Sequence, residues 1–319
     1  MRPGRRVLIL GGGPVGIEAA LAAAHLGHDV RVLEAGRVGE NLRSWGHVRM
    51  FSPWEMNCSP LGLRVLAAES SVPFGDPHQA PAGSEYLSRY LRPLAASRLL
   101  RGVVRERTRV VAIGRERMVK EDLPGGDLRS RRPFRALAET GGRREIHTAD
   151  LVIDASGTWS HPRALGDGGI PAPGEREAES FIERGLPDLD RRGVAARFAS
   201  RTILLVGAGH SAATSAVALA RLATRHPDTR IVWAFRRDRR PLYARVAGDP
   251  LAARDALCAE ANGLSSGFLK QLEARPGRVI ESMRVMRGRG ESRVEVTLTG
   301  GGNGGAERLV VDRIVANVG

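Results

Sequence analysis

Residues 6–34, RVLILGGGPVGIEAALAAAHLGHDVRVLE, contain the pattern that decides the fold of this chain. Residues 7–10 form a short apolar run typical of a buried strand, and residues 17–26 carry apolar side chains at helical spacing. A second apolar run, residues 30–33, comes after the helix. Strand, glycine turn, helix and strand in this order predict a βαβ unit with parallel strands, and therefore an α/β fold.

Three glycines and one acid in this unit have the spacing of a dinucleotide-binding fingerprint. Gly11 permits the tight turn, Gly13 lets a pyrophosphate approach the backbone, and Gly16 lets the helix pack closely on the strand. Glu34 ends the second strand, where its carboxylate can accept hydrogen bonds from ribose hydroxyls. Because an acid repels a 2′-phosphate, FAD or NAD is favoured over NADP at this first site. The alternative is an ordinary glycine-containing turn without a ligand.

Residues 201–237 repeat this pattern. We expect a strand over Thr202–Val206, a helix over residues 213–223 and a strand over Arg230–Phe235. Ala212 stands where the first unit has its third glycine, and alanine still permits close packing of the helix. A second dinucleotide site is therefore predicted.

Arginines come directly after the last strand of this second unit. Arg236 and Arg237 take the position that Glu34 has in the first unit, and Arg239 and Arg240 come next. Guanidinium groups suit a ribose 2′-phosphate, so NADPH is favoured over NADH at the second site. The alternative is that these arginines reflect only the arginine-rich composition of the chain.

Charge, hydropathy and cysteine content limit the classes of function. The net charge is +14, but every basic residue except Lys120 and Lys270 is arginine, the arginines are spread along the chain and only 4% of residues are aromatic, so we expect no nucleic-acid partner. No apolar run approaches the roughly 20 residues that span a bilayer, so we expect a cytoplasmic protein without a membrane partner. Cys58 and Cys258 form no CxxC motif, which argues against dithiol chemistry, and no metal site is expected.

The rest of the chain shows further strands, helices and loops. We expect a loop over 36–62 that lines the reactive end of a cofactor, and an interdomain crossing over 166–193. Helices are expected over 84–100, broken near Pro93, and over 250–261, ending at Asn262-Gly263. Strands are expected within 103–147 (antiparallel), over Leu151–Asp154, within 278–299 and, as the last strand, over 309–318.

The two dinucleotide units, joined through ASGTW at 155–159 and followed by DRIVANVG at 312–319, resemble FAD/NAD(P)-binding oxidoreductases with two dinucleotide-binding domains. Within that group the chain is similar to flavin-containing monooxygenase-like and thioredoxin reductase-like proteins. The resemblance implies two Rossmann-like domains, the second inserted in the first, with a small β-meander in each. Residues 1–165 and 300–319 would form the FAD-binding domain, and residues 166–299 the NAD(P)H-binding domain.

The resemblance also implies cofactor contacts residue by residue. Those to FAD would be Gly11, Gly13, Pro14, Gly16, Glu34, Val110, Ser156 and Gly157, with Arg43 and Trp45 in a loop near the flavin ring. Those to NADPH would be Gly207, Gly209, Ser211, Ala212, Arg236 and Arg237. No residue is assigned as a catalytic acid or base.

Three features depart from the family's pattern. The CxxC of the disulfide reductases is absent, the FxGxxxHxxx(W/Y) pattern of flavin monooxygenases is not found between Gly157 and Arg201, and the family's chain normally continues past the position of Gly319 into a segment that covers the flavin. We expect an NADPH-dependent, FAD-containing oxidoreductase, monooxygenase-like toward a small molecule, with homodimer formation left open. The alternatives are an electron-transfer flavoprotein reductase acting on an electron acceptor, and a truncated, non-catalytic nucleotide-binding protein.

Overall fold

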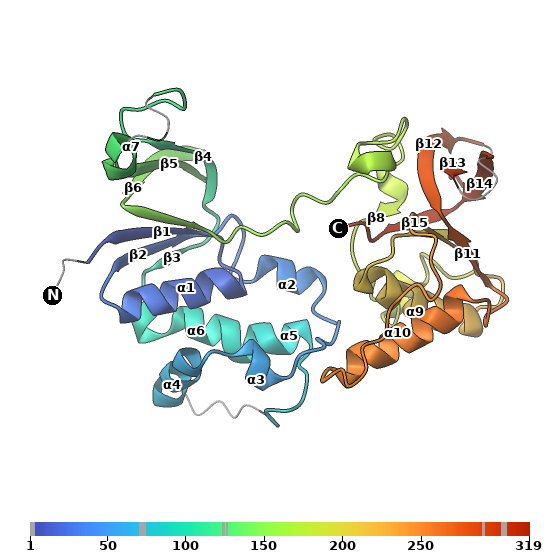
Figure 1. Cartoon of the computed structure of the whole chain (residues 1–319), viewed down its shortest axis with the longest axis horizontal. Helices are drawn as coiled ribbons and strands as arrows, with labels where there is room; N and C mark the ends of the chain where they lie inside the picture. The colour runs from blue at the N-terminus through green and yellow to red at the C-terminus, as the bar shows by residue number, and fades with distance from the viewer. Residues whose placement is uncertain (1–3, 70–74, 123–124, 126, 289–290, 301–304) are drawn as a thin grey trace. The chain divides into compact units, whose positions relative to one another are not determined.

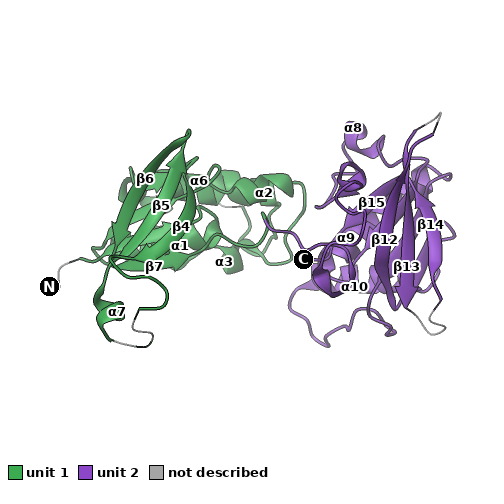
Figure 2. Cartoon of the chain, turned by 90° about the horizontal axis from the view of Figure 1, so that it is seen from above, with its two compact units in different colours: residues 1–160 green, residues 161–319 purple. Residues whose placement is uncertain are grey.

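The computed structural model describes residues 4–69, 75–122, 125, 127–288, 291–300 and 305–319 (Figure 1). The chain divides into two compact units, Met1–Ser160 and His161–Gly319 (Figure 2). Each unit combines a parallel sheet, helices on one face of that sheet and a three-stranded antiparallel meander on the other. The predicted α/β class, with a β-meander in each half, is confirmed.

The parallel sheet of the first unit has the strand order β3-β2-β1-β7. Its strands are β1 (Arg6–Leu10), β2 (Asp29–Leu33), β3 (Val104–Arg105) and β7 (Leu151–Asp154). Side chains of β1 alternate between the faces: Val7 and Ile9 pack toward the helices, and Leu8 and Leu10 toward the meander. Both faces of this strand are covered, which explains its continuous apolar run.

Helices cover one face of this sheet, and the meander covers the other (Figure 1). The helices are α1 (Pro14–His25), α2 (Glu40–Ser44), α3 (Trp54–Asn57), α4 (Pro60–Glu69), α5 (Gly83–Tyr86), α6 (Arg92–Ala96) and, beside the meander, α7 (Asp127–Arg131). The meander consists of β4 (Arg109–Arg115), β5 (Phe134–Thr140) and β6 (Arg143–Ala149). The expected loop over 36–62 therefore contains α2, α3 and the start of α4.

The helix expected over 84–100 is present but segmented. A π-helical turn, Leu87–Leu91, separates α5 from α6, and a 3₁₀ turn, Arg98–Leu100, ends the region. Pro93 is the second residue of α6, which follows the π turn directly. The helix begins one residue earlier than expected, because the Glu85 carboxylate accepts the N–H of Ala82 and closes the first turn.

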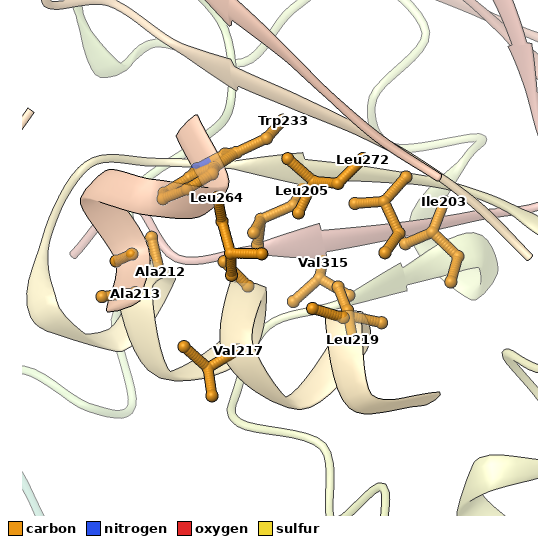
Figure 3. Packing of buried hydrophobic residues seen from close by; sticks show 14 of the residues in the cluster. Ile203, Leu205, Ala212, Ala213, Val217, Leu219, Trp233, Leu264, Leu272 and Val315 are labelled. Carbon is orange, nitrogen blue, oxygen red and sulfur yellow. The ribbon is translucent and has the colours of Figure 1, made fainter. Parts of the chain in front are cut away.

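The parallel sheet of the second unit has the strand order β11-β10-β9-β15-β8. Its strands are β8 (Ile182–Glu183), β9 (Thr202–Val206), β10 (Arg230–Phe235), β11 (Leu272–Pro276) and β15 (Arg313–Ala316). The helices of this unit are α8 (Arg192–Ala195), α9 (His210–Arg225) and α10 (Ala252–Ser265), with 3₁₀ turns at Asp167–Gly169 and Glu179–Phe181. Figure 3 shows part of its core, in which Leu219 of α9 lies on the side of the helix that faces Val315 of β15 and Ile203 of β9.

The meander of the second unit consists of β12 (Arg278–Met286), β13 (Arg293–Gly300) and β14 (Glu307–Val311). The single final strand expected over 309–318 is wrong. Residues 307–311 pair with β13 in the meander, whereas Arg313–Ala316 pair with β9 in the parallel sheet. Asp312 makes the change of sheet, and its backbone N–H donates to the carbonyl of Thr202.

The predicted domain limits differ from the two units in the structure. Strand β15 lies between β9 and β8, so the described part of 300–319 belongs with the second unit, while residues 301–304 lie outside the described residues. Each of the two units is one continuous stretch of this chain.

The interdomain crossing expected over 166–193 is also wrong. This segment is part of the second unit: β8 joins its parallel sheet, and Ala172 and Ala178 are buried in its core. The buried carboxylate of Glu175 accepts the N–H groups of Leu165 and Ala172 and pairs with Arg184 at 2.8 Å. These bonds satisfy an irregular, Gly- and Pro-rich backbone inside the protein, a role that composition alone does not reveal.

Helix α10 continues through the expected stop at Asn262-Gly263. The amide of Asn262 makes two hydrogen bonds with the backbone of Tyr243, accepting its N–H and donating to its carbonyl, both at 2.9 Å. Asn262 therefore packs a neighbouring segment onto the helix and does not end it.

Candidate dinucleotide-binding sites

The first glycine turn connects β1 to α1 at the carboxyl edge of the first sheet. Gly11 has a φ of +100° and donates its N–H to the carbonyl of Leu33 at 2.9 Å. A side-chain carbon on Gly11 would overlap the carbonyl of Ala155, and one on Gly16 would overlap the carbonyl of Gly11. Both positions therefore require glycine, the first also for its backbone conformation.

Gly13 faces open space. A side-chain carbon built on Gly13 would meet none of the described residues within 4 Å. Helix α1 begins at the next residue, Pro14, which suits the first helical position because proline has no N–H to lose. The N–H groups of the first helical turn have no partner within the helix, and the dipole is positive there, so this end favours a phosphate.

Glu34 lies directly beside this turn. Its carboxylate accepts the N–H of Gly12 at 2.5 Å and the N–H of Gly36 at 2.6 Å. The Glu34 carbonyl accepts the N–H of Thr108 at 2.8 Å, which ties it to the segment leading into β4. The acid is thus held in place by the backbone on both sides, and sequence spacing had no signal for the roles of Gly12 and Gly36.

The end of β7 forms the other wall of this edge. Leu10 of β1 is the register partner of Asp154, and Ala155 donates its N–H to the Leu10 carbonyl at 2.8 Å. Ser156 donates its hydroxyl and its N–H to the Asp154 carboxylate, and these two bonds lower the pKa of Asp154. Ser156 and the adjacent Gly157, which has a φ of +69°, are exposed beside the glycine turn.

The other three predicted FAD contacts lie in two places. Arg43 is exposed on α2, and Trp45, its C-cap, is half-buried against Gly83. Val110 packs with Leu8 and Leu10 between the sheet and the meander. The turn before α2 reaches the first site directly, since Gly39 donates its N–H to the Gly12 carbonyl.

The second glycine turn connects β9 to α9 in the same way. Gly207 has a φ of +131° and donates its N–H to the carbonyl of Ala234 at 3.1 Å. A side-chain carbon on Gly207 would overlap the carbonyl of Asn317, just after β15, but would stand 3.5 Å from the methyl group of Ala212. This helix therefore has room for the methyl group of Ala212, which the first unit lacks at Gly16.

The remaining residues predicted to contact NADPH lie at the open side of this turn. Gly209 precedes α9, and it and Ser211 are exposed. Arg236 and Arg237 come directly after β10 and are exposed as well. Since β9 and β10 are parallel neighbours, both segments leave the same edge of the sheet.

Asn317 is a residue of this site that sequence spacing did not single out. Its side-chain oxygen accepts the hydroxyl of buried Ser215 at 2.7 Å, and its amide donates to the Gly185 carbonyl at 2.9 Å. Its backbone N–H donates to the carbonyl of Val206. Asn317 thereby fixes the wall against which Gly207 packs.

The two cysteines are buried in different units. Burial raises the pKa of Cys58 to about 12 and also raises that of Cys258. Both thiols are therefore protonated at neutral pH. In the described ranges, no cluster of three or more His, Cys, Asp or Glu side chains could hold a metal ion.

Comparisons with known proteins agree with this architecture. Residues 8–120 match the family model described as pyridine nucleotide-disulphide oxidoreductase. A search of curated proteins returned no match. Bacillithiol disulfide reductase from Bacillus cereus is 18% identical with a TM-score of 0.67, over 99% of this chain and 78% of that one. The desferrioxamine-pathway cadaverine monooxygenase from Erwinia amylovora, solved with FAD, is 15% identical with a TM-score of 0.67, over 99% and 78%.

A third similar structure is thioredoxin reductase from Lactococcus lactis, with 17% identity and a TM-score of 0.55 over 99% of this chain and 77% of that one. This chain shares the fold of these reductases and of the monooxygenase, as the resemblance predicted. Reductases and monooxygenases both occur among them. In the described part of the chain, no helix has the length and apolarity to cross a bilayer.

Proposed function

We propose that this chain is an NADPH-dependent, FAD-containing oxidoreductase, with FAD at the first glycine turn and NADPH at the second. One observation carries the proposal: two glycine turns of the same geometry lie beside second strands that end in opposite charges. Glu34 comes after β2 beside the first turn, and Arg236 and Arg237 come after β10 beside the second. An enzyme that binds one dinucleotide without a 2′-phosphate and one with it needs this difference.

The first turn fits the ADP part of FAD. Gly13 leaves open space at the helix N-terminus for the pyrophosphate. Each oxygen of the Glu34 carboxylate accepts one backbone N–H, so each has a lone pair left for a ribose hydroxyl. Pro14, Ser156 and Gly157 line the same edge. Arg43, Trp45 and Val110 remain proposals for more distant parts of the cofactor.

The second turn fits NADPH. Gly207, Gly209, Ser211 and Ala212 would hold the pyrophosphate at the N-terminus of α9, a helix long enough to have a substantial dipole. Arg236 and Arg237 would bind the 2′-phosphate with charge-assisted hydrogen bonds.

Bound together, the two cofactors supply hydride transfer from a nicotinamide to a flavin. The protein's own residues bind and orient them. Among the possible electron acceptors, we propose oxygen and a small molecule, as in a monooxygenase. The chain has no CxxC, and both of its thiols are buried and protonated at neutral pH, so this chain offers no dithiol with which to reduce a disulfide by exchange.

The test begins with an absorbance spectrum of the purified chain, followed by anaerobic titration with NADPH and then NADH. We expect a flavin spectrum that NADPH bleaches at lower concentration than NADH. A protein that neither retains added FAD nor oxidises NADPH would contradict the proposal. Readmission of air then separates the two outcomes: rapid recovery of the oxidised spectrum supports oxygen as the acceptor, and slow recovery supports an electron-transfer reductase.

A further inference from the structure

Two buried aromatic side chains bond to the second glycine turn. The indole N–H of Trp233 donates to the Gly207 carbonyl at 2.9 Å, and the hydroxyl of Tyr243 donates to the Gly209 carbonyl at 3.1 Å. Their exposed fractions are 0% and 5%, and the ring centroids lie 6.4 Å apart. Both glycine carbonyls of this turn are therefore held from inside the unit.

The two aromatic residues come from different places in the chain. Trp233 lies within β10, so its position is set by the core of the sheet. Tyr243 lies beyond β10, at the end of the segment 236–243 that contains the four arginines. The Tyr243 hydroxyl is therefore a direct link between this arginine segment and the glycine turn.

Three further hydrogen bonds fix the end of the arginine segment. Arg239 donates through Nε to the carbonyl of Leu242 at 3.0 Å, which closes the segment on itself. The backbone of Tyr243 is bonded at its N–H and at its carbonyl to the side chain of Asn262 on α10. Leu242 and Tyr243 are buried, whereas residues 236–241 are exposed. The segment thus has a rigid buried end and an exposed basic part.

Burial also determines the chemistry of the Tyr243 hydroxyl. Burial raises the pKa of Tyr243 above its ordinary value, so its hydroxyl keeps its proton and remains a hydrogen-bond donor at neutral pH. The carbonyl of Gly209 accepts a second bond from the N–H of Ala213 in the first turn of α9. A shift in the position of this carbonyl would therefore move the N-terminus of α9, where a pyrophosphate would bind.

We propose that Tyr243 is a positioning residue that couples the exposed arginines of the segment 236–243 to the glycine turn and thereby contributes to the preference for NADPH over NADH. This inference rests on the proposed function of the second site. The hydroxyl is buried and bonds to the Gly209 carbonyl, so it is assigned no contact with either coenzyme. It holds the 2′-phosphate-binding segment at a set distance from the turn that binds the pyrophosphate common to both coenzymes.

The test uses the flavin-loaded protein and the variant Tyr243→Phe, which removes one oxygen and keeps the ring. The measured quantities are the apparent dissociation constants of NADPH and NADH. We expect the ratio that expresses NADPH preference to fall about three- to tenfold, the range for one neutral hydrogen bond, with most of the loss on NADPH. In the background of Arg237→Gln, the same change should leave the ratio nearly unaltered, because the coupled contact is already gone.

Tyr86→Phe is the matched control. The hydroxyl of Tyr86 is also buried and donates to a backbone carbonyl, that of Asn57 at 3.0 Å, but in the first unit. The Tyr86→Phe variant should lower the free energy of unfolding without changing the ratio of the two coenzyme dissociation constants. Asn262→Ser is a second variant. It removes the two hydrogen bonds to the Tyr243 backbone and leaves the Tyr243 hydroxyl in place, and it should also lower the NADPH preference.

The outcomes separate the inference from the function on which it rests. If the unaltered protein prefers NADPH and Tyr243→Phe keeps the same ratio as Tyr86→Phe, the coupling role is overturned and the proposed function stands. If both coenzymes weaken equally, the hydroxyl is purely structural and the inference is again overturned. If the unaltered protein does not bind NADPH, both fail together.

Discussion

The two units of this chain have glycine turns of similar backbone geometry, but the side chains beside the two turns carry opposite charges. In each, a glycine with positive φ, Gly11 or Gly207, packs against a carbonyl just beyond the neighbouring parallel strand. That carbonyl belongs to Ala155 in the first unit and to Asn317 in the second. The backbone therefore prepares a pyrophosphate site without regard to which nucleotide enters it.

The two units differ in the charge at the end of the second strand and in how tightly the helix packs. Glu34 is anchored by two backbone N–H groups, while Arg236 and Arg237 are exposed. Gly16 has no room for a methyl group, whereas Ala212 is buried with room for its own. Charge therefore distinguishes the proposed ligands, and helix packing distinguishes the tolerance of the two turns to substitution.

The largest expected effect tests the difference in packing. Gly16→Ala would force a methyl group into the carbonyl of Gly11, so we expect the free energy of unfolding of the first unit to fall by about 3 kcal/mol. The counterpart, Ala212→Gly, should cost only about 1 kcal/mol through helix propensity and a small cavity. Denaturant unfolding measures both. Equal losses in the two variants would remove the asymmetry between the units.

The second prediction removes, one at a time, the charges that distinguish the sites. Glu34→Gln places an amide NH₂ against a backbone N–H and removes the charge, so retention of FAD should weaken about tenfold or more. Arg237→Gln should weaken NADPH about ten- to hundredfold and NADH hardly at all. Arg225→Gln, which removes an exposed arginine from the end of α9, is the charge-matched control. A loss of NADPH binding in that control would point to net charge and not to the arginine segment.

The third prediction concerns the pH dependence of stability that comes from one buried cysteine, Cys58. The folded-state pKa of Cys58 is raised to about 12, above its ordinary value, so the stabilising effect is complete below about pH 8.5 and is lost as the pH rises toward 12. Between pH 8 and pH 10 the free energy of unfolding should fall by about 2 kcal/mol more in the unaltered protein than in Cys58→Ala. Parallel pH profiles for the two proteins would show that Cys58 is not the titrating group.

The smallest effect compares the serines that bond to the ends of β7 and β15. Ser215 is buried and donates to Asn317, so Ser215→Ala should cost about 1 kcal/mol by leaving an acceptor of the Asn317 amide without its donor. Ser156 is exposed and bonds to Asp154, and Ser156→Ala should cost less than about 0.5 kcal/mol. Thermal unfolding resolves this difference. A larger cost for Ser156 would mean that the first wall is as rigid as the second.

Much of the fold was predictable where local pattern and tertiary role agree. The strand predictions Leu151–Asp154, Thr202–Val206 and Arg230–Phe235 match the structure at both ends. Strands β9 and β10 are buried and read as continuous apolar runs, whereas β7 ends the sheet and exposes Leu151 and Ile153. A glycine turn marks where each of the two helices begins. The cofactor assignments on the two turns remain predictions, and the structure brings the residues of each turn to one edge of its sheet.

The structure differs from the sequence predictions where a residue that suggests a local feature is used in a tertiary contact. Asn262-Gly263 looked like a helix end, but the amide of Asn262 is used by Tyr243. The segment 166–193 looked like a linker, but Glu175 satisfies its buried backbone. One apolar run, 309–318, contained two strands of different sheets because Asp312 turns between them.

By itself, the sequence determined the two glycine turns, their helices and the sign of the charge beside each turn, because these depend on residues within about thirty positions of one another. The tertiary structure alone decided which distant groups close each turn: Ala155 and Asn317 as walls, and Tyr243 as a donor to Gly209. Hydrogen bonds between residues far apart in the chain depend on how the sheets and helices pack, and no spacing in the sequence records that packing.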